Sequence, residues 1–499
     1  MRASRPLLSL FCLAACSTDG HPKDHGTADA GGHDAAAARV LAEIPCTDTL
    51  SSIYEDPGPL PGERGAIIRC ATDVVLSRDA LQERAVGLGY TTRPLTSGTR
   101  VYRLLYRTER GTSPPSAGYS SAIVYLPDKP RAERLPVLVA SHGSRGQGPD
   151  CAPSKNHSAA AQVHPEFERL VVPLVGQGFA VMVPDLGGYA NFGAPGNPIS
   201  AYASADDAGR ATLDGARALS NLIASAVTDQ VVLVGHSLGG HSTLSALALA
   251  ETYGAGGTIA AVATFAPMWV ANRTWGALAY GPLANIYTFS KAPSPNAVVI
   301  WYHYTHGELL DGPGKGTAVF EPTKRDLVKA FVDSACWYNW EKLTALGSSL
   351  EDVFDPAFVR AVGARAAGAS DSCPDDLDGR ALCEKWMARY EADRPHVVGA
   401  AAKVPQVLAW GGKDETIPAD RITCALDRLA ADKVNLEATC VDPEASHVDV
   451  TVRGADYVVD WIAAKVLGGP PPAPCPRDAT GIVDEAGKPA TCNQVPPND

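Results

Sequence analysis

The feature that most constrains the fold of this chain is the stretch over residues 230–240, QVVLVGHSLGG. Apolar β-forming residues run directly into a G-x-S-x-G turn, and apolar residues at helical spacing follow over 242–250. A serine hydroxyl that stands clear of a sheet needs a sharp strand-to-helix turn, and crowding there demands small residues two positions before and after the serine. Gly235 and Gly239 meet that demand. A plain glycine-rich turn is the alternative, but the flanking strand and helix favour a nucleophile at Ser237.

Strand and helix patterns alternate on both sides of this turn. Three runs near the start predict antiparallel strands, at 65–76, 100–110 and 118–127. Further apolar runs separated by helical patterns predict buried strands at 135–140, 179–185, 258–267, 404–410 and 434–441. This alternation predicts right-handed crossovers and an α/β fold with a mostly parallel sheet flanked by helices. Chemistry in such sheets gathers outside the carboxyl ends of the strands, where Ser237, His142 and Asp185 lie.

The first residues have the features of an export signal. Arg2 and Arg5 precede an apolar stretch over 6–15, which is too short to span a bilayer. The sequence Leu-Ala-Ala-Cys16 resembles a bacterial lipobox, so we expect cleavage before Cys16 and a lipid anchor on that residue. Ser17 at the next position then favours the outer membrane or cell surface. An ordinary signal peptide, giving a secreted protein, is the alternative.

The rest of the chain divides by composition. Residues 1–16 are the expected signal peptide with lipobox, and residues 17–45 read as a flexible tether whose three histidines are solvated or, alternatively, bind a metal. The strand-and-helix alternation covers 46–267 and 403–467, and residues 468–499 form a proline-rich tail. Residues 268–402 interrupt the alternation and predict a helical cap or lid over the serine. Its aromatic residues pack as the cap's own core or line an acyl pocket. His303 and His306 are expected to pack in the cap or face solvent, with a role in the chemistry as the alternative. The tryptophans concerned are Trp269, Trp275, Trp301, Trp337, Trp340 and Trp386.

The cysteine count and the net charge further limit the class of protein to which this chain can belong. Ten of the twelve cysteines follow Cys16, and an even number in an exported chain predicts up to five disulfides. Spacing leaves the connectivity open, and pairing between sequence neighbours gives Cys46–Cys70, Cys373–Cys383, Cys424–Cys440 and Cys475–Cys492. No spacing resembles a zinc site, and the net charge of −12 without a long basic run argues against nucleic-acid binding.

Two polar residues complete a catalytic pattern with the serine. Asp414 follows a buried strand through Gly411-Gly412, and His447 stands between the last strand and the last helix. Acyl transfer by a serine needs a nucleophile, a base that takes its proton and an acid that holds the base, which these residues supply in the order Ser237, Asp414, His447. The alternatives are Asp185, Asp420 and Asp442 for the acid, and His396 and His241 for the base. Asp206 and Asp207 instead suit the start of a helix that Ser204 caps.

An oxyanion hole needs two backbone donors beside the nucleophile. The N–H of Leu238, directly after the serine, is the first. The second is expected in the short loop His142-Gly143-Ser144 after strand 135–140, from Gly143 or Ser144. An ordinary tight turn is the alternative interpretation of that loop.

These motifs together resemble the α/β-hydrolase superfamily over residues 65–467, and within it the chain is similar to the secretory lipase family. The resemblance rests on VPDLGG at 183–188, GHSLGG at 235–240, FAP at 265–267 and GGKDETIP at 411–418. It implies an exported serine hydrolase that cleaves small-molecule or lipid carboxylic esters, with no metal or organic cofactor. A peptidase, amidase or acyltransferase with the same residues is one alternative. A non-catalytic surface binding protein is another.

Overall fold

The computed structural model describes residues 41–155, 166–191, 197–270, 288–337, 339–366, 372–475, 482–483 and 487–492. The predicted signal peptide, Cys16 with its expected lipid anchor and most of the expected tether lie outside the described residues. In the part of the chain that is described, no helix combines the length and the apolar character needed to cross a membrane.

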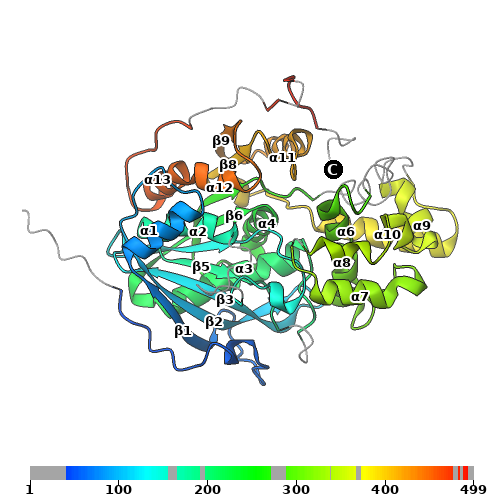
Figure 1. Cartoon of the computed structure of the whole chain (residues 1–499), viewed down its shortest axis with the longest axis horizontal. Coiled ribbons are helices and arrows are strands. Elements are labelled where there is room, and N and C mark those ends of the chain that lie inside the picture. Colours follow the sequence, from blue (N-terminus) through cyan, green and yellow to red (C-terminus); the bar gives the residue numbers. More distant parts are fainter. Residues whose placement is uncertain are drawn as a thin grey trace, which may run out of the picture. The chain divides into compact units, whose positions relative to one another are not determined.

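Nine strands of the described chain form one twisted sheet in the order β1-β2-β3-β5-β4-β6-β7-β8-β9 (Figure 1). β1 to β3 and β5 pair antiparallel, and all the other pairs are parallel, as the sequence predicted. The strands are β1 (Ile67–Leu76), β2 (Thr99–Arg110), β3 (Ser116–Pro127), β4 (Leu135–Ser141), β5 (Val181–Pro184), β6 (Val227–His236), β7 (Thr258–Phe265), β8 (Gln406–Gly411) and β9 (Leu436–Asp442).

The central strand β6 explains why helices must cover both faces of this sheet. Its residues Val231 to Val234 are apolar at every position and at most 1% exposed, so neither face of the strand can meet water. In register, Val234 lies between Ala140 of β4 and Ala263 of β7. These strands form the middle of the main apolar core.

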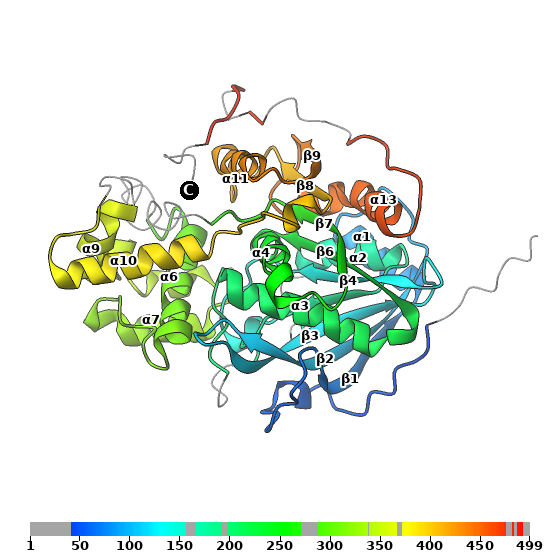
Figure 2. The ribbon, with the colours of Figure 1, turned by 180° about the vertical axis from the view of Figure 1, so that it is seen from behind.

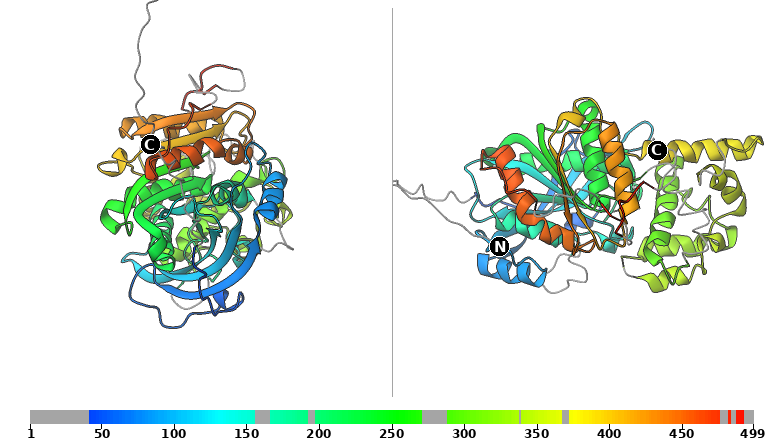
Figure 3. Two further views of the ribbon diagram at one scale, coloured as in Figure 1. Left: turned by 90° about the vertical axis from the view of Figure 1, so that its left-hand side faces the viewer. Right: turned by 90° about the horizontal axis from the view of Figure 1, so that it is seen from above.

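Helices cover the sheet on both sides, as the two additional views show (Figures 2 and 3). α3 and α4 pack together on one face, and α1, α2, α12 and α13 pack on the other. α1 is a helix that the sequence analysis did not anticipate, and α4 begins at Leu238 rather than near residue 242. The expected last helix is divided at Gly454. The helices around the sheet are α1 (Arg78–Gly87), α2 (Glu166–Gly176), α3 (Ala205–Leu222), α4 (Leu238–Tyr253), α11 (Ala419–Ala431), α12 (Asp449–Arg453) and α13 (Ala455–Val466).

Between β7 and β8 the chain leaves the sheet and forms a second group of helices with its own apolar cluster (Figure 1). Trp301 and Tyr302, both fully buried, lie at the centre of that cluster. His303 and His306 are buried there as well, so both histidines pack inside this group. The helices are α6 (Pro293–His306), α7 (Arg325–Ser334), α8 (Trp340–Thr344), α9 (Pro356–Ala366) and α10 (Leu377–Ala392).

Five disulfides join the ten described cysteines. Cys46–Cys70 and Cys373–Cys383 confirm two of the expected pairs. The expected pairs Cys424–Cys440 and Cys475–Cys492 are wrong, because Cys475 lies beside β9 and Cys492 lies beside α11. The pairs formed are Cys424–Cys492 and Cys440–Cys475, and the fifth is Cys151–Cys336.

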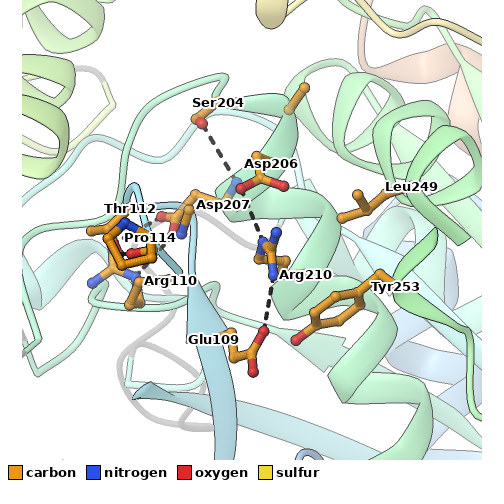
Figure 4. A network of polar contacts seen from close by, with 12 residues as sticks. Glu109, Arg110, Thr112, Pro114, Ser204, Asp206, Asp207, Arg210, Leu249 and Tyr253 are labelled. Carbon is orange, nitrogen blue, oxygen red and sulfur yellow. Dashed lines mark hydrogen bonds and ion pairs between the residues drawn. The ribbon is translucent and has the colours of Figure 1, made fainter. Parts of the chain in front are cut away.

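The start of α3 is built by charge pairing as well as by capping (Figure 4). The Ser204 side chain accepts a hydrogen bond from the Asp207 N–H, which agrees with the expected cap. The Asp207 carboxylate, however, accepts hydrogen bonds from Nε and Nη2 of the Arg110 guanidinium, each at 2.9 Å, and both side chains are at most 2% exposed. Asp206 pairs with Arg210 at 2.9 Å. Asp207 is therefore half of a buried ion pair that ties α3 to β2.

Candidate active site

Ser237 sits on a strained turn between β6 and α4. Its backbone angles are φ 55° and ψ −122°, a conformation that a non-glycine residue adopts only when the surrounding structure enforces it. A Cβ on Gly235 would stand 2.1 Å from the carbonyl oxygen of Gly239, and one on Gly239 would stand 2.0 Å from that of Ser141. Both glycines are thus required by close backbone contact, as the motif predicted.

His447 and Asp414 come together from two different loops. His447 Nδ1 lies 2.7 Å from Asp414 Oδ2, and the side chains are 13% and 0% exposed. Asp414 Oδ1 accepts hydrogen bonds from the N–H groups of Thr416 at 2.9 Å and Ile417 at 2.7 Å. The turn after β8 therefore holds the carboxylate rigidly, with one oxygen left to orient the imidazole.

A second histidine supports the loop that carries His447. His236 Nε2 lies 2.8 Å from the carbonyl oxygen of His447, and the two rings are 4.7 Å apart. Burial, with a contribution from the nearby His447, lowers the pKa of His236 to about 3, so this ring is neutral near pH 7. Because a carbonyl oxygen can only accept, the proton of the neutral ring is on Nε2. His236 thereby donates to the backbone of His447 without competing for the serine proton.

The loop after β4 passes directly beside the nucleophile. A Cβ on Gly143 would lie 3.2 Å from His236 Nδ1 and 3.5 Å from Ser237 Cβ, so this position is close to the serine. Leu238 is the first residue of α4, where the backbone N–H has no partner within the helix. His142 is buried with a pKa lowered to about 4, chiefly by desolvation, and its Nδ1 lies 2.7 Å from the Gly143 carbonyl. The predicted oxyanion donors thus border Ser237 from two sides.

Two adjoining hollows open at the serine. The smaller, of about 40 Å³, brings Gly143, Ser144, Ser237 and His447 together. The larger, of about 180 Å³, is mostly apolar and extends from Ser144 and Ser237 to the loop after Asp414 and to the helical group between β7 and β8. Its remaining lining residues are Tyr202, Met268, Trp269, Ser294, Pro295, Val298, Trp337, Glu415, Thr416, Ile417, Pro418 and Arg421.

The residues weighed against Asp414 and His447 have other partners. Asp185 is fully buried and is held by hydrogen bonds from Ser121 and Ser154. Asp442 pairs with Arg453 near the surface. His241 Nε2 lies 2.7 Å from the carbonyl oxygen of Asp393, away from the serine. Of the expected aromatic lining, Trp269 and Trp337 border the larger hollow, Trp301 and Trp386 are buried in the helical cluster, and Trp275 lies outside the described residues.

Sequence reasoning missed Tyr202, which lines the larger hollow together with Ser237 but belongs to no recognisable motif. Its hydroxyl lies 2.6 Å from Ser144 Oγ. Across the described ranges, no group of three or more histidine, cysteine, aspartate or glutamate side chains is arranged to hold a metal ion.

Comparison with known proteins adds family and fold to this geometry. Residues 155–272 match the model of the family described as secretory lipase. A secreted triacylglycerol lipase of Malassezia globosa is 26% identical over 220 residues, which are 43% of this chain and 40% of that relative. The chain thus spans well under two thirds of the curated relative's length.

Among solved structures, Candida antarctica lipase A is 18% identical with a TM-score of 0.59, covering 88% of this chain and 90% of its own. A putative hydrolase of Legionella pneumophila is 17% identical with a TM-score of 0.59, and the match covers 79% of this chain and 96% of that chain. The rice cell wall degrading esterase LipA of Xanthomonas oryzae is 16% identical with a TM-score of 0.56, and the match covers 82% of this chain and 99% of that chain. At these identities the likeness establishes the fold. The chain therefore has an α/β-hydrolase fold and resembles the secretory lipase family over residues 155–272.

Proposed function

We propose that this protein is an exported serine hydrolase that cleaves carboxylic esters through Ser237, His447 and Asp414. The observation that carries the proposal is the small hollow that Ser237 shares with His447, Gly143 and Ser144, together with the 2.7 Å contact of His447 with Asp414 behind it. Nucleophile, base, acid and backbone donors at one site are the parts that acyl transfer by a serine requires.

In the proposed reaction, His447 Nε2 takes the proton of Ser237 as its Oγ attacks the ester carbonyl. The N–H groups of Leu238 and of Gly143 or Ser144 stabilise the oxyanion. The alcohol leaves with the proton from His447, and water, deprotonated by His447, then releases the acid from the acyl-enzyme. Asp414 keeps the proton of the imidazole on Nδ1 and stabilises the imidazolium that forms.

We assign the helical segment 268–402 the role of a cap that shapes substrate choice. Met268, Val298 and Trp337 of this segment line the larger hollow together with Ser237, which supports the assignment. Export is proposed from the sequence and accords with the secreted relative, and a lipid anchor on Cys16 is proposed from the sequence alone. A Cys16→Ser variant should release the protein from the membrane fraction and abolish incorporation of labelled fatty acid.

The decisive experiment measures hydrolysis of p-nitrophenyl esters from acetate to palmitate by the wild type and by Ser237→Ala. We expect kcat to fall more than about a thousandfold in the variant. Ser242→Ala is the matched control, because Ser242 is buried on the same helix and its hydroxyl bonds only back to the Leu238 carbonyl at 3.1 Å. Equal loss in both variants would indicate a folding defect.

Parallel assays separate the alternatives. A fluorophosphonate probe should label Ser237 in the wild type, and an unlabelled, well-folded protein without turnover would favour the binding-protein interpretation. Turnover of p-nitroanilides but not of esters would favour a peptidase or amidase. Faster transfer to added alcohol than to water would favour an acyltransferase.

A further inference from the structure

Tyr202 makes a contact with the predicted oxyanion loop that the reaction as described does not use. Its hydroxyl lies 2.6 Å from Ser144 Oγ, and it also lies 3.8 Å from the sulfur of Met268. Tyr202 is 2% exposed, and burial raises its pKa well above the usual value, so the hydroxyl stays protonated at working pH. Tyr202 and Ser144 both line the larger hollow with Ser237.

A second hydrogen bond joins the same two loops. Gln147 Nε2 donates to the carbonyl oxygen of Ser200 at 2.7 Å, and both residues are buried. The loop after β4 is therefore tied to the loop before α3 through Ser144, through Gln147 and through the Gly146 carbonyl, which accepts a hydrogen bond from the Tyr189 hydroxyl. A loop held at several such points presents its backbone N–H groups in one orientation.

Tyr202 is itself held from both sides. Its backbone N–H donates to Thr305 Oγ1 of α6 at 2.9 Å, and its ring lies 5.8 Å from that of Trp301. On the other side, the buried Arg110, which pairs with Asp207 (Figure 4), donates to the carbonyl oxygen of Ile199 at 3.0 Å. The sheet and the helical segment thus both hold the backbone that carries this side chain.

We propose that Tyr202 is a positioning residue of the oxyanion hole, whose hydroxyl holds Ser144 so that the backbone N–H groups of this loop point at the reacting oxygen. The inference rests on the proposed function. Oxyanion donors act only within a narrow range of distance, so loosening the loop lowers transition-state stabilisation while leaving substrate binding nearly intact. Thr305 also contributes to this positioning, because its side chain on α6 accepts a hydrogen bond from the Tyr202 N–H.

The test compares Tyr202→Phe, Ser144→Ala and the double variant on p-nitrophenyl butyrate. We expect Tyr202→Phe to lower kcat by roughly tenfold to a hundredfold with little change in KM. Added to Ser144→Ala, it should lower kcat by less than about twofold more, because the hydroxyl that it holds is already gone. Tyr106→Phe is the matched control, since the buried Tyr106 hydroxyl donates to the Ala211 carbonyl at 2.8 Å on α3.

A boronic acid inhibitor provides a readout that a merely structural role would not move. Its tetrahedral adduct with Ser237 places an oxygen in the oxyanion hole, so the inhibition constant of butylboronic acid should rise by about the same factor as kcat falls. Unchanged kcat in Tyr202→Phe, or effects that multiply fully in the double variant, would overturn the proposal. Absence of ester turnover and of fluorophosphonate labelling in the wild type would instead overturn the proposed function itself.

Discussion

Replacing Asp414 with asparagine tests the hydrogen-bonded pair behind the serine most directly. Oδ1 of Asp414 accepts two backbone N–H groups, from Thr416 and Ile417, while Oδ2 faces His447 Nδ1 at 2.7 Å. An asparagine has a single side-chain oxygen, and we expect it to accept the hydrogen bonds from the two backbone N–H groups. Its NH₂ group then faces His447, and two donors cannot bond to each other.

The imidazole escapes this conflict by moving its proton to Nε2, so that Nδ1 can accept from the amide. With Nε2 protonated, His447 has no lone pair for the Ser237 proton. Loss of the correct tautomer costs about 10⁴ in kcat where such a replacement keeps the geometry, or about 5.4 kcal/mol of transition-state stabilisation. Because the asparagine keeps the size of the side chain and both backbone bonds, we expect the unfolding midpoint to change little.

The assay is kcat on p-nitrophenyl butyrate, with the thermal midpoint measured on the same samples. Asp442→Asn serves as the matched control, since Asp442 ends β9 near His447 in sequence but pairs with Arg453 at the surface. Asp414→Asn with more than about a tenth of wild-type kcat, or an equal loss in Asp442→Asn, would refute the reasoning.

Three further predictions follow from the same structure. The larger hollow of about 180 Å³ is close to the roughly 150 Å³ that accommodates a benzene molecule, so ester turnover should peak at acyl chains of roughly four to six carbons, and Val298→Trp should shift that peak toward acetate. The folded-state pKa of His236 is about 3, below the unfolded value of about 6.5, so its contribution to stability is present above pH 6.5 and is lost as pH falls toward 3. Urea unfolding should therefore show about 2 kcal/mol lost from this group between pH 7 and pH 5, with a shallower dependence in His236→Gln; equal slopes would contradict this. Removing the Cys151–Cys336 bridge by a double alanine variant should lower the free energy of unfolding by about 5 kcal/mol, because the bridge closes a loop between residues 185 apart, and a loss below about 1 kcal/mol would contradict the chain-entropy argument.

Elements with strong local patterns could be predicted, and those with weak patterns could not. The apolar run of β6 and the glycines around Ser237 contain their own reasons for forming a strand and a sharp turn. α1 was missed because only Leu81 and Ala85 of this helix are buried, which leaves too narrow an apolar stripe to detect. Serine is a preferred N-cap residue, so Ser77 was the one sequence signal for the start of this helix. In the structure its side chain accepts a hydrogen bond from the Ala80 N–H.

The candidate site divides in the same way. Ser237, Asp414 and His447 were selected because each follows a predicted strand, and the carboxyl ends of parallel strands meet at one edge of a sheet. The structure joins Asp414 to His447 and sets Ser237 beside His447 in one hollow. Their catalytic roles remain a prediction. Tyr202 could not be found, because nothing in its own sequence neighbourhood indicates that Ser144 lies across from it.

By itself, the sequence determined the α/β class, the mostly parallel pairing of the central sheet and the sharp serine turn, because these follow from periodicity and backbone crowding within a few residues. Only the tertiary structure decided which cysteines pair, with Cys440 joined to Cys475 and Cys424 to Cys492. It also decided that Tyr202 meets Ser144. Such contacts depend on where separate loops come to rest on the finished sheet, and no local pattern along the chain encodes that meeting.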